Sequence, residues 1–153
     1  MNSLELLKVM ENFQIFSEQL KSLHPKYAHT LSITQLKILT MLKEANTENH
    51  FNNVYFSKKF NISSAAISKA IRDLIKKNLI TELRNIDNAR EKFYLLTEEG
   101  VVIAEQHLAF FQNVSEKILS WLNATYSTSE RELIADFLCQ WEVKSLSVIQ
   151  PES

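Results

Sequence analysis

The sequence predicts a mainly α-helical fold that one short β-hairpin interrupts. Three observations predict this class. The 153 residues include only one glycine and two prolines, and a scarcity of both residues favours helices over loops and strands. Apolar residues recur at steps of three and four along most of the chain, which is typical of amphipathic helices. Two short β-branched and aromatic runs between residues 79 and 96 indicate the hairpin.

Four helices are expected in the first half of the chain. Their apolar spacing places them over residues 4–23, from about 34 to the polar run at 44–49, over 53–60 and over 64–77. Pro25 ends the first helix, because a proline disfavours helical geometry in the residue before it. Asn52 or Asn53 suits the N-cap of the third helix, and Ser63 follows a tight turn and caps the fourth.

The fourth expected helix has two chemically different faces. One face is apolar and should pack inward: Ala66, Ile67, Ala70, Ile71 and Leu74. The opposite face is small, hydroxylic and cationic: Ser64, Ala65, Ser68, Lys69 and Arg72.

The second half of the chain is expected to hold the hairpin and two further helices. The strands are placed over 79–84 and 92–96, with a polar tip between them. Thr97 caps a long helix that runs to about residue 121 or 122. Ser127 and Glu130 have the spacing of a capping box and open the last helix. The sequence contains no internal repeat, so a single domain over residues 1–153 is expected.

Charge and cysteine content limit the partners and the compartment. Residues 57–92 hold nine lysines or arginines and four acidic residues, whereas the rest of the chain holds eight basic and fourteen acidic residues. A basic middle on an acidic body indicates either a face for a polyanion or an ordinary solvated surface. One cysteine, no recognisable signal peptide and no long apolar run favour a cytoplasmic protein without membrane contact.

A short helix, a tight turn, a polar-faced helix and a hairpin follow one another, which is the order of a winged helix-turn-helix core with a two- to three-stranded β-wing. The second helix of such a motif enters the major groove, so double-stranded DNA is the expected partner. Small leading side chains let the helix approach, and lysine or arginine can reach bases or phosphates. The candidate DNA-contacting residues are Ser63, Ser64, Ala65, Ser68, Lys69 and Arg72 on the helix, Lys58, Lys76 and Lys77 for phosphates, and Arg84, Asn88 and Arg90 in the wing.

Residues 30–100 resemble the winged-helix core of the MarR family of transcriptional regulators. The matching runs are LSITQLKILTML, VYFSKKFNISSAAISKAIRDLIKKNLI and DNAREKFYLLTEEG, and the flanking helices follow the same layout. The resemblance implies a homodimer, most often a repressor, that binds a pseudo-palindromic operator. The wing departs from the family, because Asn88 stands where an aspartate usually braces the arginine two residues later. Arg84 therefore competes with Arg90 as the minor-groove residue.

The terminal segments 1–29 and 101–153 are expected to form the dimer. Their helices are too apolar to stay exposed on a monomer; the alternative is that they fold back on their own subunit. The candidate dimerisation residues are Leu6, Met10, Phe13, Leu133, Phe137 and Trp141.

Metal sensing and redox sensing are alternatives within the same family, and response to a small-molecule effector is a third. Some family members sense zinc, but their second-helix ligand positions are Leu36 and Lys37 here, and only His107 survives on the long helix, so no metal site is expected. We expect Cys139 to be a buried structural thiol and the histidines to have ordinary surface or interface roles. A small-molecule effector is a further candidate partner; Phe110 and Phe111 could line its pocket, although aromatic residues at helical spacing more often belong to the core.

Catalysis is not expected, and neither is a resident cofactor. The chain has no phosphate loop, paired metal motif or nucleophile elbow. A winged helix used for protein contact is the stronger alternative, but its outer face is expected to be apolar or acidic. The serine, lysine and arginine residues of the present face favour DNA.

Overall fold

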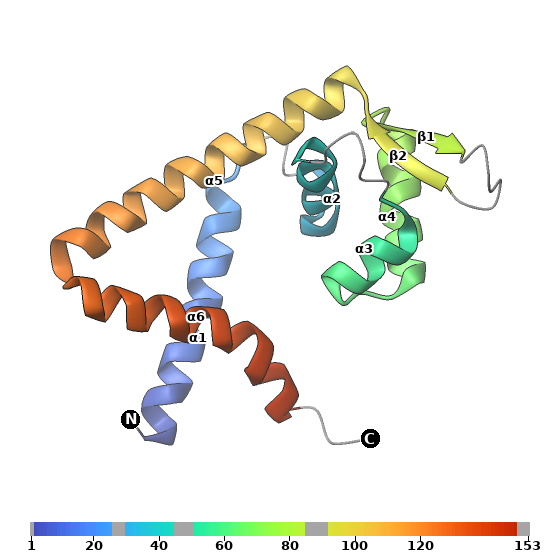
Figure 1. Cartoon of the computed structure of the whole chain (residues 1–153). Helices are drawn as coiled ribbons and strands as arrows, with labels where there is room; N and C mark the ends of the chain where they lie inside the picture. The colour runs from blue at the N-terminus through green and yellow to red at the C-terminus, as the bar shows by residue number, and fades with distance from the viewer. Residues whose placement is uncertain (1, 26–29, 45–50, 85–91, 150–153) are drawn as a thin grey trace. The chain divides into compact units, whose positions relative to one another are not determined.

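The computed structural model describes residues 2–25, 30–44, 51–84 and 92–149. The elements are α1 (Ser3–Leu23), α2 (Ile33–Glu44), α3 (Asn53–Phe60), α4 (Ser64–Lys76), β1 (Ile80–Arg84), β2 (Lys92–Leu96), α5 (Glu98–Thr125) and α6 (Thr128–Ile149). Residues up to Phe110 form one compact unit and those from Phe111 a second, with α5 contributing to both. The predicted class, mainly helical with one hairpin wing, is confirmed, and the sheet has two strands (Figure 1).

The core of the first unit is the winged helix itself. Helices α2, α3 and α4 and the hairpin pack together in Figure 1, and their apolar side chains make one cluster. Its fully buried members include Ile38, Leu39, Phe56, Ile67, Leu74 and Ile80. Each such side chain contributes about 1.5–3 kcal/mol of burial free energy, which fixes the three helices against the sheet.

The turn between α3 and α4 is built from local hydrogen bonds. Asn61 adopts the left-handed conformation, with φ of 51°, which asparagine tolerates better than most residues. The N–H of Ile62 then donates to Ser57 O at 3.1 Å. Ser63 Oγ accepts the N–H of Ala66 at 3.3 Å, so the predicted N-cap of α4 is confirmed.

The hairpin is antiparallel, with Ile80 opposite Leu96 and Arg84 opposite Lys92. Thr97 ties it to α5, because its N–H donates to Leu79 O at 3.1 Å and its Oγ1 accepts from the N–H of Gly100 at 3.0 Å.

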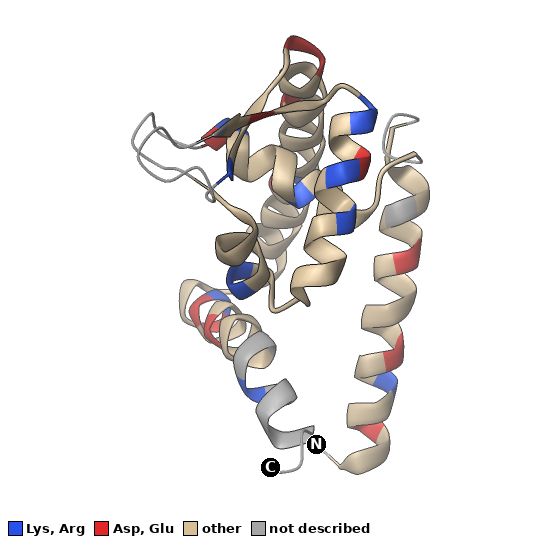
Figure 2. Cartoon of the chain, turned by 90° about the vertical axis from the view of Figure 1, so that its right-hand side faces the viewer, with Lys and Arg blue, Asp and Glu red and all other residues tan. Residues whose placement is uncertain are grey.

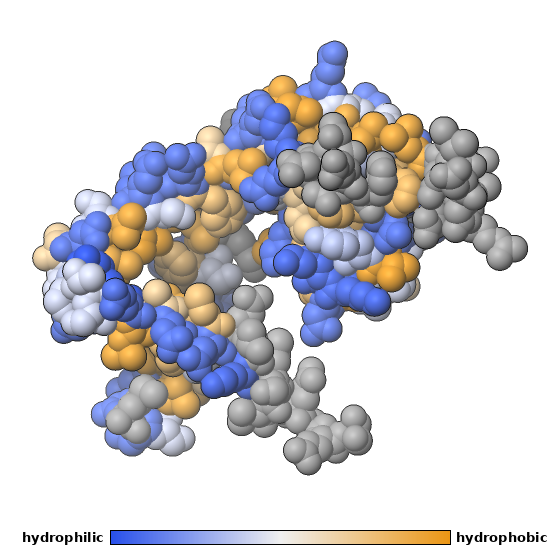
Figure 3. Space-filling view, in the orientation of Figure 1, coloured by the Kyte–Doolittle hydropathy of each residue, from blue (hydrophilic) through white to orange (hydrophobic). Residues whose placement is uncertain are grey.

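The second unit holds the end of α5 and the whole of α6. Ser127 and Glu130 form the predicted capping box: Ser127 N–H donates to Glu130 Oε2 at 2.8 Å, and Glu130 N–H donates to Ser127 Oγ at 3.4 Å. No residue described beyond Phe110 is buried, and apolar side chains stay on the surface of the molecule (Figure 3).

Several expectations need correction. Ala66 is exposed, because it lies on the flank of α4 that faces the start of α2. Helix α5 continues to Thr125, past the expected end, since no glycine or proline stops it. Cys139 is exposed on α6 in the single chain, whereas His107 is buried in the first unit. Among the described helices, none combines the length and apolar character needed to span a membrane.

Candidate nucleic-acid interface

The two faces of α4 separate as expected except at Ala66. Ile67, Ala70, Ile71 and Leu74 are buried. Ser64, Ala65, Lys69 and Arg72 are exposed, and Ser68 is half-buried. Figure 2 shows lysine and arginine gathered on the side of the molecule that carries α3 and α4. The structure therefore presents a cationic helix surface whose opposite side is anchored in the core.

Ser68 is tied to the rest of the winged helix by side-chain hydrogen bonds that sequence reasoning missed. Asn53, the first residue of α3, donates from Nδ2 to Ser68 Oγ at 3.0 Å. Tyr94 of β2 donates from its hydroxyl to Asn53 Oδ1 at 2.7 Å. Burial, with a smaller contribution from the charge of Glu82, raises the pKa of Tyr94, which keeps this phenol protonated as a donor.

The three candidate phosphate-binding lysines differ in their contacts within the chain. Lys58 and Lys76 are exposed in the last turns of their helices. Lys77 is also exposed, but its Nζ donates to Thr30 O at 2.7 Å. The candidate phosphate contact at Lys77 therefore has one of its three N–H donors engaged within the chain.

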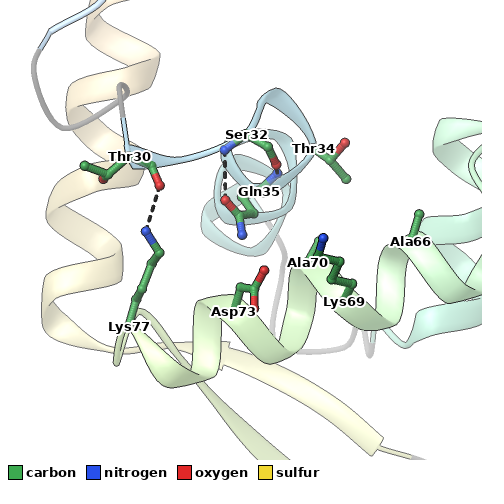
Figure 4. Close-up of a pocket in the computed structure, with 9 residues that line it drawn as sticks. All are labelled: Thr30, Ser32, Thr34, Gln35, Ala66, Lys69, Ala70, Asp73 and Lys77. Carbon is green, nitrogen blue, oxygen red and sulfur yellow. Dashed lines mark hydrogen bonds between the residues drawn. The ribbon is translucent and has the colours of Figure 1, made fainter.

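An open pocket of about 460 Å³ lies between the start of α2 and the flank of α4 (Figure 4). Ser32, which precedes α2, and Gln35 of α2 form a capping box at its upper rim, with the Ser32 N–H donating to Gln35 Oε1 at 2.8 Å and the Gln35 N–H donating to Ser32 Oγ at 3.2 Å. Lys69 and Asp73 of α4 line it, as does Lys77, the C-cap of that helix. Phe110 and Phe111, which were candidates for an effector pocket or for the core, do not line this pocket.

The wing is only partly described. Arg84 ends β1, whereas the candidates Asn88 and Arg90 lie outside the described residues. The choice between Arg84 and Arg90 stays a prediction.

The histidines form a contact within the first unit. The rings of His24 and His107 have centroids 5.6 Å apart, and His24 also packs edge-on against Phe110 at 4.7 Å. Burial, and then the nearby His24, lowers the pKa of His107. The described part of the chain contains no cluster of three or more histidine, cysteine or acidic residues that could hold a metal ion.

The candidate dimerisation residues are largely uncovered in the single chain. Met10, Phe13, Leu133 and Phe137 are exposed, at 42%, 42%, 69% and 42%, and Leu6 and Trp141 are half-buried. A sequence pattern could reveal these apolar faces, but not the polar contacts at Asn53, Tyr94 and Lys77, because these join residues 15 to 47 positions apart.

The architecture defines a winged-helix regulator, and comparisons with known proteins agree. Residues 19–106 match the family described as transcriptional regulator SarA/Rot. The chain belongs to this family, which is one of transcriptional regulators and not of enzymes.

Several relatives and solved structures resemble the chain over most of its length. It is 35% identical to the transcriptional regulator AdcR of Streptococcus pneumoniae over 110 residues, 71% of this chain and 70% of AdcR. The crystal structure of the adhesin competence repressor AdcR from Streptococcus pyogenes matches with a TM-score of 0.71 and 27% identity, covering 92% and 96% of the two chains. The structure of Lactococcus lactis ZitR in complex with DNA matches with a TM-score of 0.60 and 28% identity, covering 74% and 75%.

Proposed function

We propose that this regulator is a MarR-like homodimer that binds a pseudo-palindromic site in double-stranded DNA. The observation that carries the proposal is α4, whose outer face is exposed and cationic while its inner face is buried in the core. Two α4 helices would enter successive major grooves, roughly 34–36 Å apart. Lys58 and Lys76 would contact phosphates, and the wing would contact the minor groove.

Repression by occupying the operator is the proposed mode of action. The named resemblance to a repressor, AdcR, and to ZitR in complex with DNA supports it. We further propose one MarR-like domain over residues 1–153, with the DNA-binding core over about 30–100 and dimerisation by residues 1–29 and 101–153. Cytoplasmic location and response to a small-molecule effector through α5 remain predictions from the sequence.

Exposed apolar residues on α1 and α6 support the dimer, because a monomer would leave them in water.

The recognition surface is tested by substituting one residue of α4. Arg72→Ala should weaken operator binding by about 5- to 100-fold, as expected for one arginine contact. Fluorescence anisotropy with a labelled duplex at physiological salt measures the loss. Lys117→Ala is the matched control, since it removes one exposed positive charge from α5 and should leave affinity unchanged. Equal affinities of Arg72→Ala and the unmodified protein would show that α4 is not the recognition helix.

The wing needs its own comparison. Arg90→Ala should weaken binding to operators with A·T-rich flanks more than Arg84→Ala does, because arginine is drawn to narrow minor grooves. If only Arg84→Ala weakens binding, the contact belongs to Arg84.

A further inference from the structure

The contact between Asn53 and Ser68 sets the direction of a hydrogen bond on the recognition face. A serine hydroxyl has one proton and two lone pairs, so it can donate or accept. Ser68 Oγ accepts an N–H from Asn53 at 3.0 Å, which occupies one lone pair on the protein side. The proton of Ser68 and its second lone pair are then left for partners other than Asn53.

The alternative use of that proton is a bond to the helix backbone, which other hydroxyls of this chain make. Thr40 Oγ1 donates to Leu36 O at 2.6 Å, and Thr125 Oγ1 donates to Trp121 O at 2.9 Å. Within the described part of the chain, Ser68 Oγ makes no such bond to the helix backbone; its hydrogen bond is the one that it accepts from Asn53, so its proton is still to be paired.

Tyr94 fixes which end of the Asn53 amide faces Ser68. A phenol is a better donor than acceptor, because its ring draws electron density from the oxygen. The hydroxyl of Tyr94 donates to Asn53 Oδ1 at 2.7 Å, so the Nδ2 end is turned toward Ser68. Tyr94 is itself only 5% exposed, so the surrounding side chains hold its hydroxyl in place beside Asn53.

We propose that Asn53, oriented by Tyr94, is a positioning residue that makes Ser68 a hydrogen-bond donor toward one base pair. This inference rests on the proposed function. In the major groove, purine N7, guanine O6 and thymine O4 are acceptors, whereas the amino group of cytosine is a donor. A base edge that presents an acceptor pairs the proton of Ser68, whereas a cytosine amino group would leave that proton unpaired, so Ser68 favours an acceptor over cytosine.

Asn53→Asp should reverse this preference. A carboxylate accepts from both Tyr94 and Ser68, so Ser68 turns its proton inward and presents lone pairs to the DNA. An aspartate also suits the first turn of a helix, so α3 should persist. Asn52→Asp is the matched control: it adds the same charge one residue earlier and keeps the N-cap, in which Asn52 Oδ1 accepts from Tyr55 N–H at 2.9 Å.

The experiment is selection from a random duplex library by the full-length protein, followed by sequencing. The base pair at which Ser68→Ala loses its preference identifies the contacted position. There, the unmodified protein and Asn52→Asp should favour an acceptor base by about fivefold, the usual worth of one neutral hydrogen bond. Asn53→Asp should favour cytosine, and Tyr94→Phe should weaken the original preference.

The result of the same selection distinguishes failure of this inference from failure of the proposed function. If Asn53→Asp selects the same base as the unmodified protein, the inference is overturned while the proposed function stands. If the unmodified protein enriches no sequence, the proposed function fails instead. If Asn53→Asp loses its helical circular-dichroism signal and so does not fold, the Tyr94→Phe variant provides the test instead. An unchanged base preference in Tyr94→Phe would then overturn the inference.

Discussion

Helices α4 and α6 both carry large apolar side chains, yet these side chains are covered to very different extents within one chain. Four residues of α4 are buried by the rest of its own winged helix. On α6, Leu133 and Phe137 remain 69% and 42% exposed, and none of its described residues is buried. The apolar side chains of α4 are therefore covered within the winged helix, whereas those of α6 remain exposed in one chain.

This difference assigns the two regions different physical tasks. A helix that is locked on one side can present a fixed polar surface on the other, which is what groove recognition requires. Covering the exposed apolar side of a helix with a second copy of the chain is favourable, because it removes apolar surface from water. We infer that stability of the winged helix and stability of the dimer can be perturbed separately.

The largest expected effect comes from placing charges among the exposed apolar side chains of α6. Leu133→Glu combined with Phe137→Glu should weaken dimerisation by about 100-fold or more, because each buried large side chain contributes about 1.5–3 kcal/mol. Sedimentation equilibrium measures the change. Leu95→Glu on β2, at a site 51% exposed, is the control and should leave the dimer intact. A double variant that dimerises as well as this control would contradict the assignment.

The next largest effect is expected from a substitution in the first unit, at Gly100. A Cβ there would overlap the carbonyl oxygen of Leu79, which already accepts from Thr97 N–H at 3.1 Å. Gly100→Ala should lower the free energy of unfolding by about 2–3 kcal/mol in urea. Val102→Ala, at an exposed site on the same helix, should change it by less than about 0.5 kcal/mol. A gain in stability, as for a glycine at an open helix position, would be the contrary result.

A smaller effect concerns the buried contact of His107. Burial, followed by the nearby His24, lowers the pKa of His107 below its ordinary 6.5. The unfolded chain therefore takes up a proton before the folded chain does, so stability should fall as pH drops below about 6.5 and be fully present above it. Unfolding midpoints measured at several pH values should show this slope, and His107→Leu should flatten it. An equal slope in both proteins would exclude His107 as its source.

Local signals explain how much of this structure could be predicted from sequence. The caps at Ser63, Thr97 and Ser127 each depend on residues within three positions, so spacing alone identified them. The exposed cationic face of α4 followed from its 3.6-residue period.

The missed features depend on the assembled fold. Ala66 has the period of the inner face, but its exposure depends on where α2 lies. Cys139 has apolar neighbours in sequence, and these stay uncovered because α6 lacks a covering layer in one chain. The bonds from Asn53 to Ser68 and Tyr94 require three elements to meet, and no short-range pattern encodes that meeting.

The salt dependence of DNA binding tests the central claim most directly. Each phosphate contact releases counterions, so log K should fall steeply with log salt concentration for the unmodified protein. Lys76→Ala on α4 should reduce that slope by about 0.9, the value for one contact, and Lys117→Ala on α5 should not change it. A flat salt response, or the same slope in all three proteins, would contradict the account of α4 as the DNA-binding surface.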